Sequence, residues 1–186
     1  MLWTPRFFAL SLLAGTVPAG AVLAAKQTAI PSPVDKLHRA DSECRDYDVR
    51  HMKDARVTAK LSGGQTLYLL PCFAAAYNVV YRVYVFDKRY PDELKRSLFA
   101  GYSDAVGWYG KDSLLNAQFD PKTKTLSAFE MARGLGDCGG IPKFQWTDYR
   151  WRMIEYRYWG KCDATHMPED WPVIYRYKKP DKSRLP

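Results

Sequence analysis

The sequence predicts a mainly β protein: an antiparallel sandwich or barrel-like sheet with one short helix and two disulfides. Short runs rich in β-branched and aromatic residues recur along the chain, separated by Gly, Pro, Asp and Ser residues. The chain also carries an even number of cysteines, four, which indicates a disulfide framework in an oxidising compartment. Residues 36–178 are long enough to form a single β-rich domain with its own hydrophobic core.

Residues 1–25 have the order of a secretory signal peptide. A single arginine precedes an apolar run over residues 7–14, and small residues lead up to a cleavage site after Ala24 or Ala25. Gly and Pro residues interrupt the segment, so an uncleaved membrane anchor is disfavoured. Residues 26–35 contain two prolines and are expected to be a flexible lead-in. The mature chain is therefore expected in the periplasm, with no transmembrane span after cleavage.

The elements that follow are mostly strands and turns. Residues 35–48 are highly charged and fit either a helical turn or an extended loop. The helix is expected over residues 91–98, because Pro91 suits a first helical turn, acidic residues follow it, and Leu94 and Leu98 would share a face. Strands are expected at residues 57–61, 66–70, 78–86, 114–119, 125–129, 143–146, 151–159 and 173–178. Turns at residues 62–65, 120–124 and 147–150 connect neighbouring strands, the last two as hairpins.

The four cysteines allow three disulfide connectivities. We expect the sequential pairing, Cys44 with Cys72 and Cys138 with Cys162, because each pair then brackets one β unit. No two cysteines have the C-x₂-C spacing of a zinc site, and the three histidines are scattered. The sequence therefore indicates neither a metal site nor a catalytic triad, and no cofactor is expected.

Residues 134–139 fit the string G-x-G-x-x-G. A dinucleotide site needs this string between a strand and a helix, whereas a β hairpin follows it here. We interpret the glycines as turn residues that fix Cys138 for its disulfide. Asp137 then has two interpretations: hydrogen bonding within the turn, which we favour, or the acid or base of a hydrolase that acts on envelope material. No catalytic residue is predicted.

Aromatic residues are dense in the hairpin over residues 143–159. They could form a stacking platform for a sugar or a peptide, or they could be core and cross-strand pairs, which we favour. If the hairpin binds a ligand, the candidate residues combine these rings with nearby charges: Arg133, Asp137, Trp146, Arg150 and Trp151.

Basic residues gather at the end of the chain. Residues 176–186 hold five basic residues and one acidic residue, which accounts for half of the net charge of +8. The basic tail, residues 179–186, could attract an anionic envelope component, or it could simply keep the protein in solution. Nucleic acid is not expected as a partner, since the chain carries no recognisable binding motif.

Several blocks carry a family resemblance. The most specific is Arg-Gly-Leu-Gly-Asp-Cys-Gly over residues 133–139; the others lie at residues 66–72, 76–78, 114–120, 124–127, 144–146, Trp151, Cys162 and 171–172. From about Gly64 to Tyr177 the chain resembles domain-of-unknown-function family 1176, exported envelope proteins of Gram-negative bacteria. The resemblance implies a periplasmic location and no transferable activity. Members are often longer, so this chain resembles their C-terminal part, and it departs from their pattern at Ala75 and at Thr147-Asp148.

These observations leave three functional hypotheses. The leading one is a non-catalytic periplasmic module that binds an envelope component or a protein partner. The second is an envelope-directed hydrolase that uses Asp137. The third is a protein like the lysozyme inhibitors, although the Ser-Gly-x-x-Tyr signature of one such group is not met, because Thr66 stands where its tyrosine would be.

Overall fold

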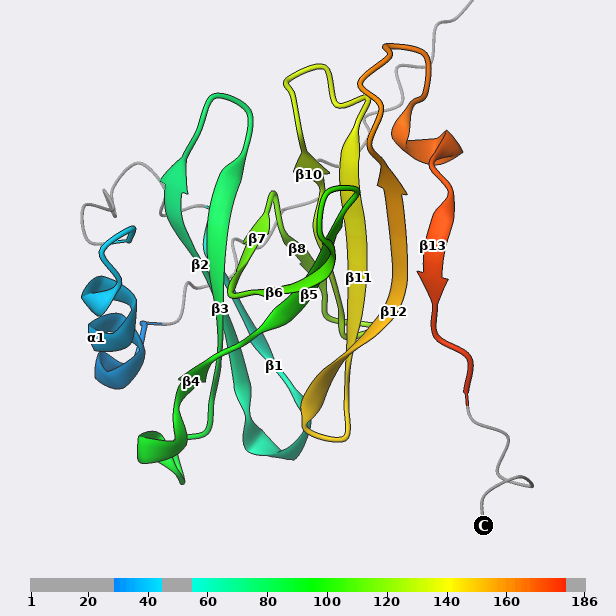
Figure 1. The fold of residues 1–186 in the computed structure, drawn as a ribbon. Helices are drawn as coiled ribbons and strands as arrows, with labels where there is room; N and C mark the ends of the chain where they lie inside the picture. Colours follow the sequence, from blue (N-terminus) through cyan, green and yellow to red (C-terminus); the bar gives the residue numbers. More distant parts are fainter. Residues whose placement is uncertain (1–28, 45–54, 180–186) are drawn as a thin grey trace, which may run out of the picture.

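The computed structural model describes residues 29–44 and 55–179. The predicted signal peptide, part of the predicted lead-in and the predicted tail beyond Lys179 lie outside the described residues. Two antiparallel sheets face each other, and a helix covers the outer face of one of them (Figure 1).

The first sheet has the strand order β1-β2-β3-β4, and β7 also pairs with β3. The second has the order β13-β12-β11-β9-β8, with β10 beside β11, and a separate hairpin, β5–β6, packs against β11 and β12. The first sheet consists of β1 (Val57–Lys60), β2 (Thr66–Ala74), β3 (Val79–Phe86), β4 (Lys95–Arg96) and β7 (Ser113–Leu115). The second sheet and the hairpin consist of β5 (Phe99–Ser103), β6 (Gly107–Lys111), β8 (Gln118–Asp120), β9 (Thr125–Ser127), β10 (Glu130–Met131), β11 (Gly139–Thr147), β12 (Arg150–Trp159) and β13 (Val173–Arg176).

Strand β2 is buried on both faces, which explains its nearly unbroken apolar run. Leu67 and Leu69 point into the core between the sheets, where Phe144 of β11 also lies. Tyr68 and Leu70 alternate with them and pack on the other side, against the helix α1 (Ser32–Ala40). Within residues 29–44 and 55–179, the mainly β fold with antiparallel sheets, one short α-helix and two disulfides is therefore confirmed.

The helix lies elsewhere than the sequence suggested. Residues 91–98 form a short 3₁₀ turn, Pro91–Glu93, followed by strand β4. The two leucines of the expected helix face do not share a buried surface, because Leu94 packs against the cluster that contains Tyr84, whereas Leu98 is 75% exposed. Pairing with β3 satisfies the backbone of β4 instead. The α-helix begins at Ser32, inside the predicted lead-in, because its buried residues Val34 and His38 lie one turn apart and cover the first sheet.

The strand expected over residues 114–119 is divided. Asn116 has a left-handed backbone, with φ of 47°, and separates β7 from β8. Its side chain holds the break in place, because Oδ1 accepts a hydrogen bond from the Val79 amide at 2.9 Å and Nδ2 donates one to the Phe129 carbonyl at 3.0 Å. One asparagine thus joins the two sheets. The sequence analysis also missed β5, β6 and β10.

The remaining hairpins and the cysteine pairing agree with the sequence predictions. β8 pairs with β9, and β11 with β12. Asp148 and Tyr149 both have positive φ, 49° and 59°, which is the backbone of a tight two-residue hairpin turn. Cys44 is bonded to Cys72, and Cys138 to Cys162, as predicted.

Candidate functional site

The sequence-predicted site residues fall into two groups at opposite ends of the β11–β12 hairpin. Arg133 and Asp137 precede the first strand of the hairpin, whereas Trp146, Arg150 and Trp151 flank its turn. A strand advances about 3.3 Å per residue, so the length of β11 separates the two groups by about 25 Å. The structure does not bring these five residues into one site.

Asp137 is enclosed by hydrogen-bond donors. Its side chain is fully buried, and Arg133 binds both carboxylate oxygens, with Nε 2.7 Å from Oδ1. The Ala164 amide donates to Oδ2 at 2.7 Å. The hydrogen bond from Arg133 is the main reason why the pKa of Asp137 falls to about 2. With Cys138 bonded to Cys162 next to it, this carboxylate links the 133–137 loop to the segment after β12.

Trp146 and Trp151 pack together at the other end. Their ring centroids are 5.1 Å apart, and Trp146 is buried and donates from Nε1 to the Ser62 hydroxyl at 3.1 Å. They line a shallow depression of about 370 Å³ with Tyr149, Arg150 and other residues. Trp146 thus belongs to the core and, together with its neighbours, also borders the depression.

A larger cavity lies between the β5–β6 hairpin and strands β10, β11 and β12. It has a volume of about 440 Å³ and is open to solvent. Five aromatic side chains line it: Tyr102, Tyr109, Tyr156, Tyr158 and Trp159. None of the sequence-predicted site residues lines it. We call it the Glu130 pocket, after the carboxylate that lies in it.

A buried ion pair stands in the Glu130 pocket. Lys111 of β6 pairs with Glu130 of β10, and their side chains are only 14% and 10% exposed. The Tyr156 hydroxyl donates to Glu130 Oε2 at 3.5 Å and accepts from the Tyr102 amide at 3.3 Å. Burial raises the pKa of Glu130, and the Lys111 ammonium opposes that rise. Burial, and next the charge of Glu130, also raise the pKa of Tyr156 and of Tyr109.

Two glycines at the start of β11 make room for these side chains. A Cβ on Gly140 would lie 2.5 Å from the Tyr156 hydroxyl oxygen. Gly139 has φ of 136°, and a Cβ there would overlap the Glu130 carbonyl. Glycine inside a strand often marks such a close approach, and this was the signal in the sequence that could have pointed here. The sequence analysis interpreted the glycine block as a turn alone.

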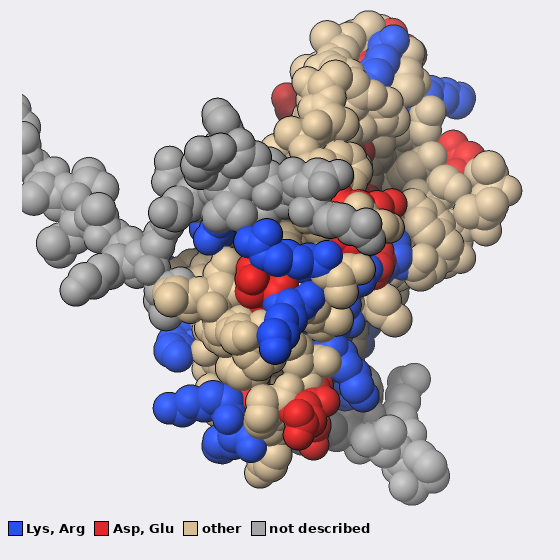
Figure 2. Space-filling model, turned by 90° about the vertical axis from the view of Figure 1, so that its left-hand side faces the viewer, with Lys and Arg blue, Asp and Glu red and all other residues tan. Residues whose placement is uncertain are grey.

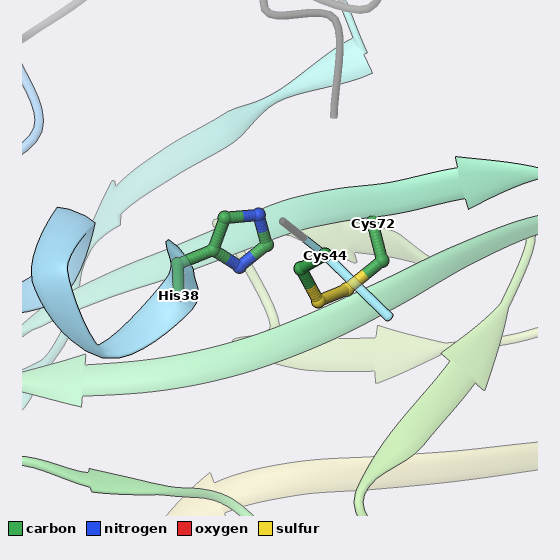
Figure 3. A group of neighbouring side chains, drawn as sticks. All are labelled: His38, Cys44 and Cys72. Carbon is green, nitrogen blue, oxygen red and sulfur yellow. A yellow bond between two sulfur atoms is a disulfide. The ribbon is translucent and has the colours of Figure 1, made fainter. Parts of the chain in front are cut away.

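Three potential metal ligands also meet elsewhere, beneath α1. His38, Cys44 and Cys72 place their ligand atoms within 4.8 Å of one another, and Figure 3 shows the imidazole beside the disulfide. While the two sulfurs are bonded to each other, they are not thiolate ligands. The ring nitrogens of His38 lie 3.2 Å from the Tyr84 hydroxyl and from the Pro71 carbonyl, and burial lowers the pKa of His38 to about 4. This group connects α1 to the first sheet.

The face that carries α1 shows basic side chains interspersed with acidic ones (Figure 2). Arg39 pairs with Asp35 at 3.0 Å, and Arg82 and Arg96 share Asp41 at 2.8 and 2.9 Å. These arginines are neutralised locally, so this face does not present a uniform basic surface to an anion.

A family model described as "Protein of unknown function (DUF1176)" matches residues 11–178. The chain belongs to the DUF1176 family. It is also similar to the uncharacterised protein YpfG of Escherichia coli (strain K12), with 28% identity over 123 residues. That alignment covers 66% of this chain and 35% of YpfG, so this DUF1176 chain spans about a third of its relative's length. No solved structure matches it.

The Glu130 pocket lies inside the DUF1176 match, since its residues run from Tyr102 to Gly160. Within residues 29–44 and 55–179, no helix has the length and apolar character needed to cross a bilayer. The family description assigns no activity, so a function has to be argued from the pocket itself.

Proposed function

We propose that this DUF1176 protein is a non-catalytic periplasmic module that binds an uncharged carbohydrate of the cell envelope in the Glu130 pocket. The observation that carries the proposal is the buried Lys111–Glu130 pair inside an open cavity with aromatic walls. The predicted signal peptide and the two disulfides support the periplasmic location.

The chemistry of the pocket fits a sugar ring. A sugar presents C–H groups on its faces, and these pack against aromatic rings such as Tyr102 and Tyr158. Its hydroxyl groups both donate and accept hydrogen bonds. Lys111 supplies a donor and Glu130 an acceptor, so adjacent hydroxyls can bind both. Because the two charges cancel, the ion pair favours a neutral ligand over a strongly charged one.

The surroundings of Asp137 support a structural role for this residue. Arg133 and the Ala164 amide occupy its carboxylate oxygens, and the low pKa keeps it ionised at neutral pH. An ionised carboxylate has no proton to give, so Asp137 is poorly suited to act as a general acid. The carboxylate of Asp137 is also fully buried, so it offers no surface that a substrate could contact.

A second candidate function rests on Glu130. Its raised pKa is typical of carboxyl groups that act as general acids, and it faces a cavity. The hydrolase hypothesis is therefore better placed on Glu130 than on Asp137. The two candidates differ in a measurable product: a hydrolase shortens an oligosaccharide that it binds, and a binding module leaves it intact.

Calorimetry and tryptophan fluorescence with a panel of neutral hexoses and N-acetylhexosamines test the proposal. We expect at least one of these sugars to bind with a Kd of about 1 mM, because so small a pocket makes few contacts. Glu130→Gln should weaken binding about tenfold, since it removes the charged acceptor.

Glu155→Gln is the matched control. Glu155 also lies in an ion pair, with Lys143 at 3.0 Å, and belongs to β12, but it does not line the pocket. Its variant should bind the sugar like the wild type. Absence of binding across the panel, or equal binding by Glu130→Gln and the wild type, contradicts the proposal. Release of shorter products that stops in Glu130→Gln would favour the hydrolase.

A further inference from the structure

The inner face of the second sheet continues beyond the core into the Glu130 pocket. On β11, Gly140 and Phe144 lie on the same face because side chains alternate along a strand. Phe144 packs in the core between the sheets, whereas Gly140 lines the pocket. Gly140 is paired with Tyr158, and Pro142 with Tyr156. The pocket thus lies at the end of the sandwich, where the β5–β6 hairpin covers the second sheet beside β7 of the first sheet, whose Ser113 and Leu115 also line the cavity.

Aromatic rings continue across this face, past the wall of the pocket. Tyr156 is paired with Tyr175 of β13, and Trp108 of β6 contacts both rings, with centroid distances of 5.3 and 6.1 Å. Tyr102 contacts Trp108 at 5.2 Å and Tyr158 at 4.9 Å. We call Tyr102, Trp108, Tyr156, Tyr158 and Tyr175 the aromatic row.

Two members of the aromatic row reach the surface outside the pocket. Trp108 is 47% exposed and Tyr175 is 37% exposed, although each is a large ring in contact with others. Tyr156 at the pocket is 1% exposed. The row therefore runs from the buried Tyr156 at the pocket outward to an edge strand, and exposed rings of this kind are typical of binding surfaces.

The aromatic row crosses the strands rather than following one. β10, β11, β12 and β13 lie side by side in this order (Figure 1). Adjacent strands are about 4.8 Å apart, so β10 and β13 are about 14 Å apart across the sheet. Glu130 is in register with Tyr158 and Tyr175 with Tyr156, and this offset of two residues brings the distance from Glu130 to Tyr175 to about 16 Å. A single sugar ring does not span this distance, whereas a chain of about three rings does.

We infer that the Glu130 pocket is one end of an extended site for a linear, neutral oligosaccharide, which runs from Glu130 over Trp108 to Tyr175. This inference rests on the proposed function and adds the length and direction of the ligand. A chain of sugar rings fits the row better than a peptide, because the pocket offers one balanced ion pair and aromatic faces, and its polar groups suit hydroxyls that both donate and accept.

A chain-length series tests the inference. The mono-, di-, tri- and tetrasaccharide of the sugar that binds are titrated by calorimetry into the full protein and two variants. For the wild type, we expect affinity to rise up to the trisaccharide and then to level off. Tyr175→Ala should weaken trisaccharide binding about fivefold, the typical value of one aromatic contact, and leave the monosaccharide unchanged.

Ile174→Ala is the matched control, because Ile174 is next to Tyr175 on β13, has the same exposure of 37% and points to the opposite face. It should bind the whole series like the wild type. Equal affinity for every length, with monosaccharide binding intact, overturns the extended site and leaves the proposed function standing. An equal loss of mono- and trisaccharide binding in Tyr175→Ala also overturns it, as does tighter binding of a peptide than of the trisaccharide. If no sugar of any length binds, both proposals fail.

Discussion

Glu130 and Asp137 are buried carboxylates only seven residues apart, yet their surroundings differ in two respects. Asp137 is fully enclosed, and Arg133 and the Ala164 amide bind its two oxygens. Glu130 has one cationic partner, Lys111, and a long hydrogen bond from Tyr156, and it lies in a cavity that is open to solvent. The pKa of Asp137 is lowered to about 2 by the hydrogen bond from Arg133, whereas burial raises the pKa of Glu130.

Burial alone does not distinguish the two carboxylates, whereas their hydrogen bonds and their access to a cavity do. Hydrogen bonds to the charged form stabilise Asp137 as a carboxylate, and they hold two segments of the chain together. Glu130 is desolvated but faces an open cavity, and carboxyl groups with a raised pKa in a cavity are frequent at functional sites. Three predictions test this division of roles.

The largest effect is expected when the disulfide beside Asp137 is removed. Cys138→Ala with Cys162→Ala opens a bridge with a sequence separation of 24 residues, which should cost about 3–4 kcal/mol of unfolding free energy in the chain-entropy model. Thermal denaturation should show a midpoint lower by about 10 °C. The segment that carries Ala164 would then lose its anchor, so the low pKa of Asp137 should rise as well.

The control for the disulfide variant is Cys44→Ala with Cys72→Ala, whose separation is similar, 28 residues. It should lower the midpoint comparably, while the pKa of Asp137 stays low, because that bridge is at α1. If both pairs of substitutions change the Asp137 pKa equally, the disulfide at Cys138 does not position the carboxylate.

A smaller loss of stability is expected for Asp137 itself. Asp137→Ala leaves the Arg133 guanidinium and the Ala164 amide without their acceptor, so the thermal midpoint should fall by several degrees. Asp137→Asn keeps the shape of the side chain and one acceptor oxygen, so its thermal midpoint should fall less. Sugar binding per folded molecule should remain in both variants. Unchanged melting curves together with lost binding would reverse the roles of Asp137 and Glu130.

The smallest effect, and the sharpest test, is the pH dependence of stability. The folded state releases the Asp137 proton more readily than the unfolded chain, so this stabilisation is present above the ordinary pKa of 3.8 and is lost as the pH falls toward about 2. The folded state holds the Glu130 proton more tightly. The contribution of Glu130 to the free energy of unfolding therefore diminishes as the pH rises above its ordinary pKa of 4.5.

Denaturant unfolding from pH 2 to pH 8 measures how the free energy of unfolding changes with pH. Subtracting the value of each variant from that of the wild type isolates the contribution of each carboxylate. The stability of wild type minus Asp137→Asn should decrease toward acid, and that of wild type minus Glu130→Gln should decrease toward neutral pH. Slopes of the same sign would show that the two carboxylates do not differ as the structure implies.

Most of the strands, two hairpins and the cysteine pairing were predictable from local sequence patterns. The alternation in residues 57–61 and the turn at residues 147–150 are local properties, and they were recognised for this reason. Asp137 and its partner Arg133 are also close in the sequence, four residues apart, and a structural role for Asp137 stays a prediction. The helix expected over residues 91–98 was wrong because local signals cannot show whether a neighbouring surface will bury its apolar face.

The Glu130 pocket, in contrast, depends on how distant strands pack together. Lys111, Glu130 and Tyr156 come from three different strands, and no fixed spacing along the chain relates them. They meet because the β5–β6 hairpin, which was not predicted from the sequence, packs on the second sheet there, beside β7 of the first sheet. The alternation of a strand tells which residues share a face, but the packing of one sheet on the other decides where that face becomes core and where it remains an open cavity.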